Sequence, residues 1–154
     1  MKTKQKILKI FRGPPGSGKT YTCNKLAPAE NIFSTDDFWL IDGKYIFDSS
    51  KLSKAHEWNI ERVNHAMQQN LTPILIANTN IKIRDFKPYV ELAKAHGYEV
   101  SYNLPDSPWF VEIYPRIVNK TFTDQDVFTF VEKTVHSVPF EAIKRMMDRW
   151  EEII

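Results

Sequence analysis

Residues 13–20 read Gly-Pro-Pro-Gly-Ser-Gly-Lys-Thr, and they contain three of the five glycines in the chain. Their spacing matches G-x-x-x-x-G-K-[ST], the phosphate loop, in which glycines let backbone amides approach a phosphate without Cβ collisions. An apolar run at 6–11 precedes the loop, and a stretch without helix breakers at 20–26 follows it. This context predicts a strand, a phosphate-binding turn and a helix in succession.

The chemistry of this motif assigns roles to its side chains. Lys19 is expected to reach the β- and γ-phosphates of a nucleotide, and the Thr20 hydroxyl is expected to ligate Mg²⁺. The amino end of the following helix adds partial positive charge toward the same anion. We therefore expect ATP and Mg²⁺ as cofactors. The predicted binding residues are Gly13, Pro15, Gly16, Ser17, Gly18, Lys19, Thr20 and Tyr21.

Strands and helices alternate along the first two thirds of the chain. Short apolar runs at 31–34, 73–78 and 98–102 predict three further strands, and helical spacing of apolar residues predicts helices over 50–70 and 84–96. Such alternation favours an α/β three-layer sandwich around a four-stranded parallel sheet.

The segment after the fourth predicted strand shows no clear period before Thr123. There Thr123 and Asp126 form a capping-box-like helix start, and a last helix opens near Pro139. We predict that 109–136 forms a helical lid, in which a mobile cation closes over the transferred phosphate. The composition leaves three candidates for that cation: Arg116, Lys120 and Lys133.

Length and composition restrict the class of protein. The 154 residues predict a single domain over 1–154. One cysteine, Cys23, excludes an internal disulfide and, with no apolar run long enough to span a membrane, favours a cytoplasmic protein. The net charge of +2 is too small to indicate a nucleic-acid partner by itself.

An acidic pair, Asp36 and Asp37, follows the predicted second strand. Carboxyl ends of neighbouring parallel strands share one crevice, so one of these carboxylates is expected to face the γ-phosphate. A carboxylate there suits a kinase, because it orients a hydroxyl group and accepts its proton. The alternative is that the pair caps a helix. The third strand ends in Asn78 and has no acid of the kind that switch or motor ATPases place there.

Two polar residues, His56 and Asn59, fall on the apolar face of the helix predicted over 50–70. A buried polar group without a hydrogen bond costs about 1–3 kcal/mol. These residues are therefore either satisfied core groups or part of a substrate site. Trp58 and Arg62 flank the same face, where they either pack or grip a substrate.

Five sequence blocks together resemble the P-loop kinase domain of the Nedd-four-binding protein two family. They extend from residue 13 to residue 151, and they read GPPGSGKT, STDDFW, AHEWNIERV, NTNIKIRDFKPYVELAKAHGYEV and HSVPFEAIKRMMDRWE. The chain is more distantly similar to the kinase half of T-even phage polynucleotide kinase-phosphatase and to the kinase-like domain of the myelin cyclic-nucleotide phosphodiesterase. The resemblance implies an adenylate-kinase-like P-loop NTPase core that phosphorylates a 5′-hydroxyl of DNA or RNA with ATP.

The resemblance to the phage enzyme also implies individual roles. Its general base falls on Asp36, and its lid arginine falls on Lys133, five residues before Val138. Two positions differ. The phage kinase has an arginine three residues after the base where this chain has Trp39, and an aspartate at the end of the third strand where this chain has Asn78.

We predict an ATP-dependent kinase whose acceptor is a hydroxyl, with the 5′-hydroxyl of a polynucleotide as the first choice. Two alternatives stay open: a kinase of a nucleotide, sugar or other small molecule, and a nucleotide-dependent interaction module whose catalysis has decayed. The sequence does not decide whether such a polynucleotide is DNA or RNA, and it does not give the oligomeric state. The predicted substrate contacts are Asp37, Trp39, His56 and Asn78.

Overall fold

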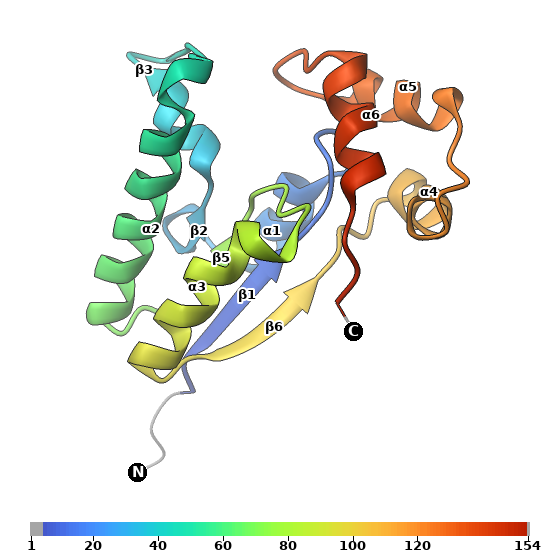
Figure 1. Ribbon diagram of the computed structural model, residues 1–154. Coiled ribbons are helices and arrows are strands. Elements are labelled where there is room, and N and C mark those ends of the chain that lie inside the picture. The colour runs from blue at the N-terminus through green and yellow to red at the C-terminus, as the bar shows by residue number, and fades with distance from the viewer. Residues whose placement is uncertain (1–4, 154) are drawn as a thin grey trace.

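A four-stranded sheet carries the fold of this chain. The computed structural model describes residues 5–153, and every strand pair in its main sheet is parallel, in the order β2-β5-β1-β6 (Figure 1). The predicted four-stranded parallel sheet is therefore confirmed. Its strands are β1 (Ile7–Phe11), β2 (Ile32–Phe33), β5 (Ile74–Ile76) and β6 (Glu99–Asn103).

Three helices cover the two faces of the sheet: α1 (Lys19–Leu26), α2 (Leu52–Gln68) and α3 (Ile83–His96). Leu75 in β5 is buried in the same cluster as Cys23 of α1. Its neighbour Ile76 is buried in a different cluster, with Val63 of α2. Successive side chains of a strand point to opposite faces, so α1 and α2 lie on opposite sides of the sheet. The predicted three-layer sandwich is confirmed.

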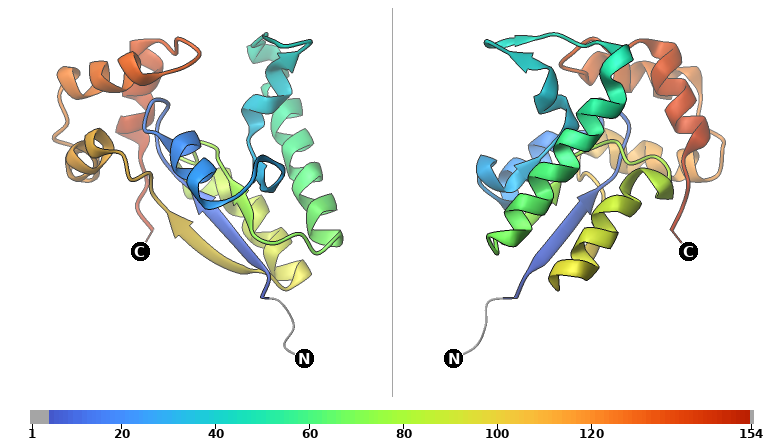
Figure 2. Two further views of the ribbon diagram at one scale, coloured as in Figure 1. Left: turned by 180° about the vertical axis from the view of Figure 1, so that it is seen from behind. Right: turned by 60° about the vertical axis from the view of Figure 1, so that its left-hand side comes forward.

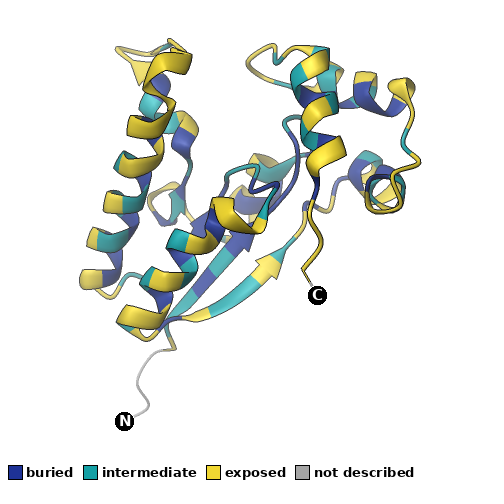
Figure 3. Cartoon of the chain, in the orientation of Figure 1, coloured by how far each residue is buried: buried dark blue, intermediate teal, exposed yellow. Residues whose placement is uncertain are grey.

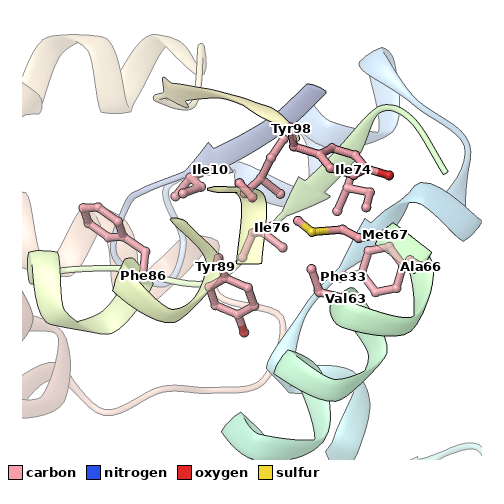
Figure 4. Packing of buried hydrophobic residues seen from close by; sticks show 12 residues of the cluster. Ile10, Phe33, Val63, Ala66, Met67, Ile74, Ile76, Phe86, Tyr89 and Tyr98 are labelled. Carbon is pink, nitrogen blue, oxygen red and sulfur yellow. The ribbon is translucent and has the colours of Figure 1, made fainter. Parts of the chain in front are cut away.

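The larger core cluster lies between the sheet and helices α2 and α3 (Figure 4). Along α2 the buried positions form one side of the helix, and the other side is exposed (Figure 3). Burying a large aliphatic or aromatic side chain contributes about 1.5–3 kcal/mol, so this interface holds the two helices on the sheet. Its buried members are Leu8, Ile10, Phe33, Val63, Ala66, Met67, Ile74, Ile76, Phe86, Tyr89, Ala93 and Tyr98.

The C-terminal third forms a helical subdomain with an apolar cluster of its own. Its helices are α4 (Pro108–Val118), α5 (Asp124–Lys133) and α6 (Phe140–Arg149). The capping box of Thr123 and Asp126 and the start of α6 after Pro139 agree with the sequence. Helix α4 was not expected, because Pro115 interrupts its pattern. It begins with a serine cap, in which the Ser107 hydroxyl accepts a hydrogen bond from the Phe110 amide at 3.2 Å.

A short antiparallel hairpin was also not expected. Its strands β3 (Leu40–Ile41) and β4 (Lys44–Tyr45) follow a 3-10 turn, η2 (Thr35–Trp39), which comes directly after β2. The hairpin and the amino end of α2 stand on one side of the loop 13–20, and helices α4 to α6 stand on the other (Figure 2). Among residues 5–153, no helix has the length and apolar character needed to cross a membrane.

Candidate active site

The loop 13–20 connects β1 to α1 and takes backbone conformations that favour glycine. Gly16 has φ +83° and Gly18 has φ +94°, both in the left-handed region. A Cβ atom on Gly16 would lie 2.1 Å from the carbonyl oxygen of Phe130 in α5. Glycine is therefore needed at position 16 for two reasons: the left-handed conformation of the turn and the close approach of α5.

Side chains of α4 and the residue before it hold the loop from the other direction. The Ser107 hydroxyl donates to the Ser17 carbonyl at 2.8 Å, and the Trp109 indole donates to the Gly16 carbonyl at 2.8 Å. The Lys133 ammonium lies 4.5 Å from the centre of the Trp109 ring. The fold thus connects Lys133 to the loop through Trp109, a connection between distant residues that no local sequence pattern predicts.

Lys19 bends back over its own loop. Its ammonium donates to the carbonyl oxygens of Gly13 at 2.7 Å and Pro14 at 3.2 Å. Burial lowers the pKa of Lys19 to about 8, and the negative charge of Asp36 acts in the opposite direction. The predicted phosphate ligand and the predicted base therefore belong to one electrostatic site.

Asp36 is exposed on η2, where its backbone amide donates to the Ser34 hydroxyl at 3.2 Å. Ser34, rather than either aspartate, caps this turn, so the capping interpretation of the acidic pair is wrong. Burial, followed by the charge of Asp36, raises the pKa of Tyr45 to about 12. The Asp36 carboxylate therefore lies near a phenol that stays protonated at neutral pH.

Asp37 points to α2, where its carboxylate pairs with the Arg62 guanidinium at 3.2 Å. The same guanidinium lies 3.9 Å from the centre of the Trp58 ring. Of the two interpretations for Trp58 and Arg62, the structure therefore shows packing and ion pairing within the protein. Of these two adjacent aspartates, Asp37 has an ion pair, and Asp36 has none among residues 5–153.

Trp39 does not present its ring to the site. It is 3% exposed and packs edge-on against Phe38, with ring centroids 5.0 Å apart, and against Phe47, at 4.9 Å. Because these contacts bury the indole, the expectation that Trp39 contacts a substrate receives no support from its position.

His56 and Asn78 line a polar cavity of about 300 Å³ between α2 and α3. Arg84 and Asp85, at the start of α3, lie on its wall. Asn59 does not reach the cavity: it is fully buried, and its amide donates to the Tyr89 hydroxyl at 2.8 Å. Of the two polar residues on α2, Asn59 is thus a satisfied core group, whereas His56 is exposed at the cavity.

The lid segment supplies three cations with different surroundings. Arg116 forms two bonds to Asp126, at 2.7 and 2.8 Å, and Lys120 donates to carbonyl oxygens at the end of α6, the nearest being that of Asp148 at 2.7 Å. Both of these side chains hold helices together. Lys133 has no ion pair among residues 5–153, and it is the one of the three that lies beside the phosphate-binding loop.

The two sides of the site touch through a pair of rings. Tyr45 of the hairpin stacks on His136, which follows α5, with centroids 3.6 Å apart and planes 5° from parallel. Their contact could not be predicted from the sequence, because it joins segments that come together only in the folded chain.

The remaining predicted nucleotide ligands lie at the start of α1. Thr20 and Tyr21 are exposed, Tyr21 with 66% of its surface, and Lys25 lies 4.9 Å from the centre of the Tyr21 ring. Gly13 is buried and Pro15 is partly buried in the loop. Over residues 5–153, no three His, Cys, Asp or Glu side chains form a cluster that could hold a metal ion without further ligands.

Comparison with known proteins agrees with this fold. The family model described as "AAA domain" (AAA_33) matches residues 8–153. The chain is 34% identical over 151 residues to human NEDD4-binding protein 2, a match that covers 96% of this chain and 8% of that protein. A chain in the Pnkp1/Rnl/Hen1 RNA repair complex superposes with a TM-score of 0.60 at 20% identity, over 97% of this chain and 45% of that one. This chain therefore spans less than half the length of each relative, and the resemblance inferred from the sequence is confirmed.

Proposed function

Because this chain belongs to the AAA_33 family of AAA domains, we propose that it is an ATP-dependent kinase that transfers the γ-phosphate to a hydroxyl group. The observation that carries the proposal is the phosphate loop, with Gly16 and Gly18 in left-handed conformations and the Lys19 ammonium folded over the loop. The charge of Asp36, which has no ion pair among residues 5–153, acts on the pKa of that lysine. A lysine for the phosphates and a carboxylate for the acceptor hydroxyl are groups that kinases use in phosphoryl transfer to an alcohol.

The nucleotide side of the proposal rests on the loop 13–20. Backbone amides there would bind the β- and γ-phosphates, and Lys19 would exchange its two loop carbonyls for phosphate oxygens. The exposed Thr20 hydroxyl suits Mg²⁺, which prefers oxygen ligands and would neutralise charge on the phosphates. Lys133, which approaches the loop through Trp109, would neutralise charge on the transferred group.

In the proposed reaction, Asp36 holds the acceptor hydroxyl by a hydrogen bond and takes its proton. The acceptor oxygen forms a bond to the γ-phosphorus while the bond from that phosphorus to the β–γ bridging oxygen breaks. ADP leaves with the electron pair of the broken bond, held by Lys19 and the loop amides. General-base assistance of this kind contributes about 10²–10⁴-fold in rate.

For the acceptor, we propose the 5′-hydroxyl end of a polynucleotide. The cavity lined by His56 and Asn78 lies beside η2, since Asn78 also bonds the amide of Thr35, next to Asp36. Arg84 on its wall and the exposed His56 offer donors for a phosphodiester. The likeness of the fold to a chain of an RNA repair complex is the further support.

A small-molecule acceptor is the second candidate, and the cavity volume of about 300 Å³ favours it, because one nucleotide or sugar would fill that space. A module with decayed catalysis is disfavoured because Asp36 stays close enough for its charge to act on Lys19, an arrangement that such a module would not need.

A transfer assay separates these possibilities. The protein is incubated with γ-labelled ATP and Mg²⁺ and with a 5′-hydroxyl DNA or RNA oligonucleotide, the same oligonucleotide already carrying a 5′-phosphate, or a panel of nucleosides and sugars. We expect label only in the 5′-hydroxyl oligonucleotides and none with Lys19→Ala. Label in the small molecules alone would assign the second candidate, and no label in any acceptor despite ATP binding would contradict a kinase.

A further inference from the structure

The turn that carries Asp36 is held by a side chain from α2. One terminal nitrogen of the Arg62 guanidinium donates to the carbonyl oxygen of Ser34 and to the carboxylate of Asp37, each at 3.2 Å. These partners lie two residues before and one residue after Asp36. Arg62 therefore clamps both ends of the four-residue segment that presents the proposed base.

Arg62 is itself held in one orientation. The same nitrogen donates to the Asn59 side-chain oxygen at 2.7 Å, and the guanidinium lies over two aromatic rings, 3.9 Å from the centre of Trp58 and 5.2 Å from that of Phe33. A planar guanidinium stacked on a ring loses its rotational freedom, so its bonds have a fixed direction. This rigidity lets a residue on a helix define the position of a turn.

A second connection reaches the same turn from the sheet. The Thr35 amide donates to the Asn78 side-chain oxygen at 2.8 Å, and the Asn78 amide group in turn contacts the Tyr89 hydroxyl at 3.4 Å. Asn59 donates to that same hydroxyl at 2.8 Å. Tyr89 belongs to the main core cluster (Figure 4), so both connections end on the rigid part of the protein.

We propose that Arg62 is a positioning residue for the phosphoryl transfer, which it supports by holding the 34–37 turn so that Asp36 meets the acceptor hydroxyl. Asn59, Asn78 and Tyr89 complete this polar network. The inference rests on the proposed function, because it takes Asp36 as the base. Asn78 then acts on the turn through its bond to Thr35 and is not primarily a substrate ligand.

The energetics favour this role. Hydrogen bonds from a charged donor are stronger than those between neutral groups, so the bonds from Arg62 favour one conformation of an exposed turn. A misplacement of about 1 Å in a reacting group can lower the rate about 100-fold. Among residues 5–153, Asp36 has no ion pair to orient it, so the position of its carboxylate depends on the backbone that Arg62 and Asn78 hold and on the neighbouring Tyr45 phenol.

Position 39 of η2 supplies no charge to the turn, because Trp39 is buried against Phe38 and Phe47. The positive charge next to the acidic pair comes from Arg62 on α2, and it is directed at Asp37.

A double-mutant cycle tests the inference on the full chain. Arg62→Ala and Arg62→Lys are each made alone and with Asp36→Asn, and kcat for transfer is measured with the Kd for ATP. We expect Arg62→Ala to lower kcat about 10- to 100-fold and to leave ATP binding unchanged. Arg62→Lys keeps a positive charge and hydrogen-bond donors but lacks the planar guanidinium that lies over Trp58, and it should recover part of that loss. In the Asp36→Asn background, Arg62→Ala should cost less than about twofold, since the group it positions is gone.

Independent, multiplicative losses in the double variant would overturn the inference. So would a raised KM for the acceptor with unchanged kcat, which would make Arg62 a substrate ligand. No loss with Asp36→Asn alone would instead remove the base assignment, and with it the proposed mechanism. Thermal unfolding is monitored throughout, and Arg145→Ala, on an exposed part of α6, serves as the control. If Arg62→Ala does not fold, Tyr89→Phe keeps the core ring, removes the shared hydroxyl, and should show the same coupling to Asp36.

Discussion

The loop 13–20 and the turn 34–37 face each other across the site, but the protein holds them in different ways. Distant side chains bond backbone atoms of both: Ser107 and Trp109 bond carbonyl oxygens of the loop, and Arg62 and Asn78 bond the turn. The loop differs because it also takes left-handed conformations at Gly16 and Gly18 and meets the backbone of α5 at Gly16. Those conformations and that close approach need glycines at fixed positions, and a sequence motif records that need. Hydrogen bonds from distant side chains leave no comparable pattern.

From this comparison we expect substitutions in the turn to lower kcat and substitutions in the loop to weaken ATP binding. The largest effect is expected at the turn, with Asp36→Asn. An amide cannot accept the hydroxyl proton, so kcat should fall about 10²–10⁴-fold while ATP binding is retained. The measurement is steady-state transfer alongside the Kd for ATP. A variant with full kcat would show that Asp36 is not the base.

A change in the loop should instead weaken nucleotide binding. Gly16→Ala places a Cβ 2.1 Å from the Phe130 carbonyl oxygen, at a φ that disfavours any side chain. We expect the affinity for ATP to fall about 100-fold, measured by calorimetry, because loop and α5 must move apart. Gly43→Ala is the matched control: its φ is +79°, but a Cβ there meets nothing within 4 Å. Equal ATP affinity in the two variants would show that the contact with α5 has no part in shaping the loop.

The smallest effect is a pH dependence on the nucleotide side. Lys19 must be protonated to bind phosphate, and its pKa in the free protein is lowered to about 8 by burial. The affinity for ATP should therefore be constant below pH 8 and fall by up to about tenfold per pH unit above it. Lys19→Arg, which stays charged, should flatten the profile over pH 7–9.5. An unchanged profile in that variant would assign the pH dependence to another group.

Local pattern predicted most of the α/β core. The strands at 6–11, 31–34, 73–78 and 98–102 all correspond to strands of the sheet, because buried parallel strands are short apolar runs between turns. Helix α4 was not predicted as a separate helix within the expected helical lid, because Pro115 lies within it. Its apolar face is recognisable only where it packs against α5 and α6. The hairpin of β3 and β4 has only two residues in each strand, too few for a detectable alternation.

The predicted site residues divide in the same way. The charge of Asp36 acts on the pKa of Lys19, whereas Lys133 approaches the loop only through Trp109, which no motif marks. Trp39 was expected at the substrate, but its neighbours on η2 and after the hairpin bury it. A single aromatic residue in a sequence does not show which of its faces other chain segments will cover.

By itself, the sequence determined the phosphate-loop motif and the order of strands and helices in the α/β core. These depend on neighbours within about a dozen residues, through glycine spacing, hydrophobic period and helix caps. Only the tertiary structure decided which polar groups are held within the protein and which are free to act. Asp37 pairs with Arg62, which lies 25 residues further along the chain, whereas the adjacent Asp36 has no ion pair among residues 5–153. That division follows from long-range hydrogen bonds, which form only after packing has brought α2, α3 and the ends of the strands together.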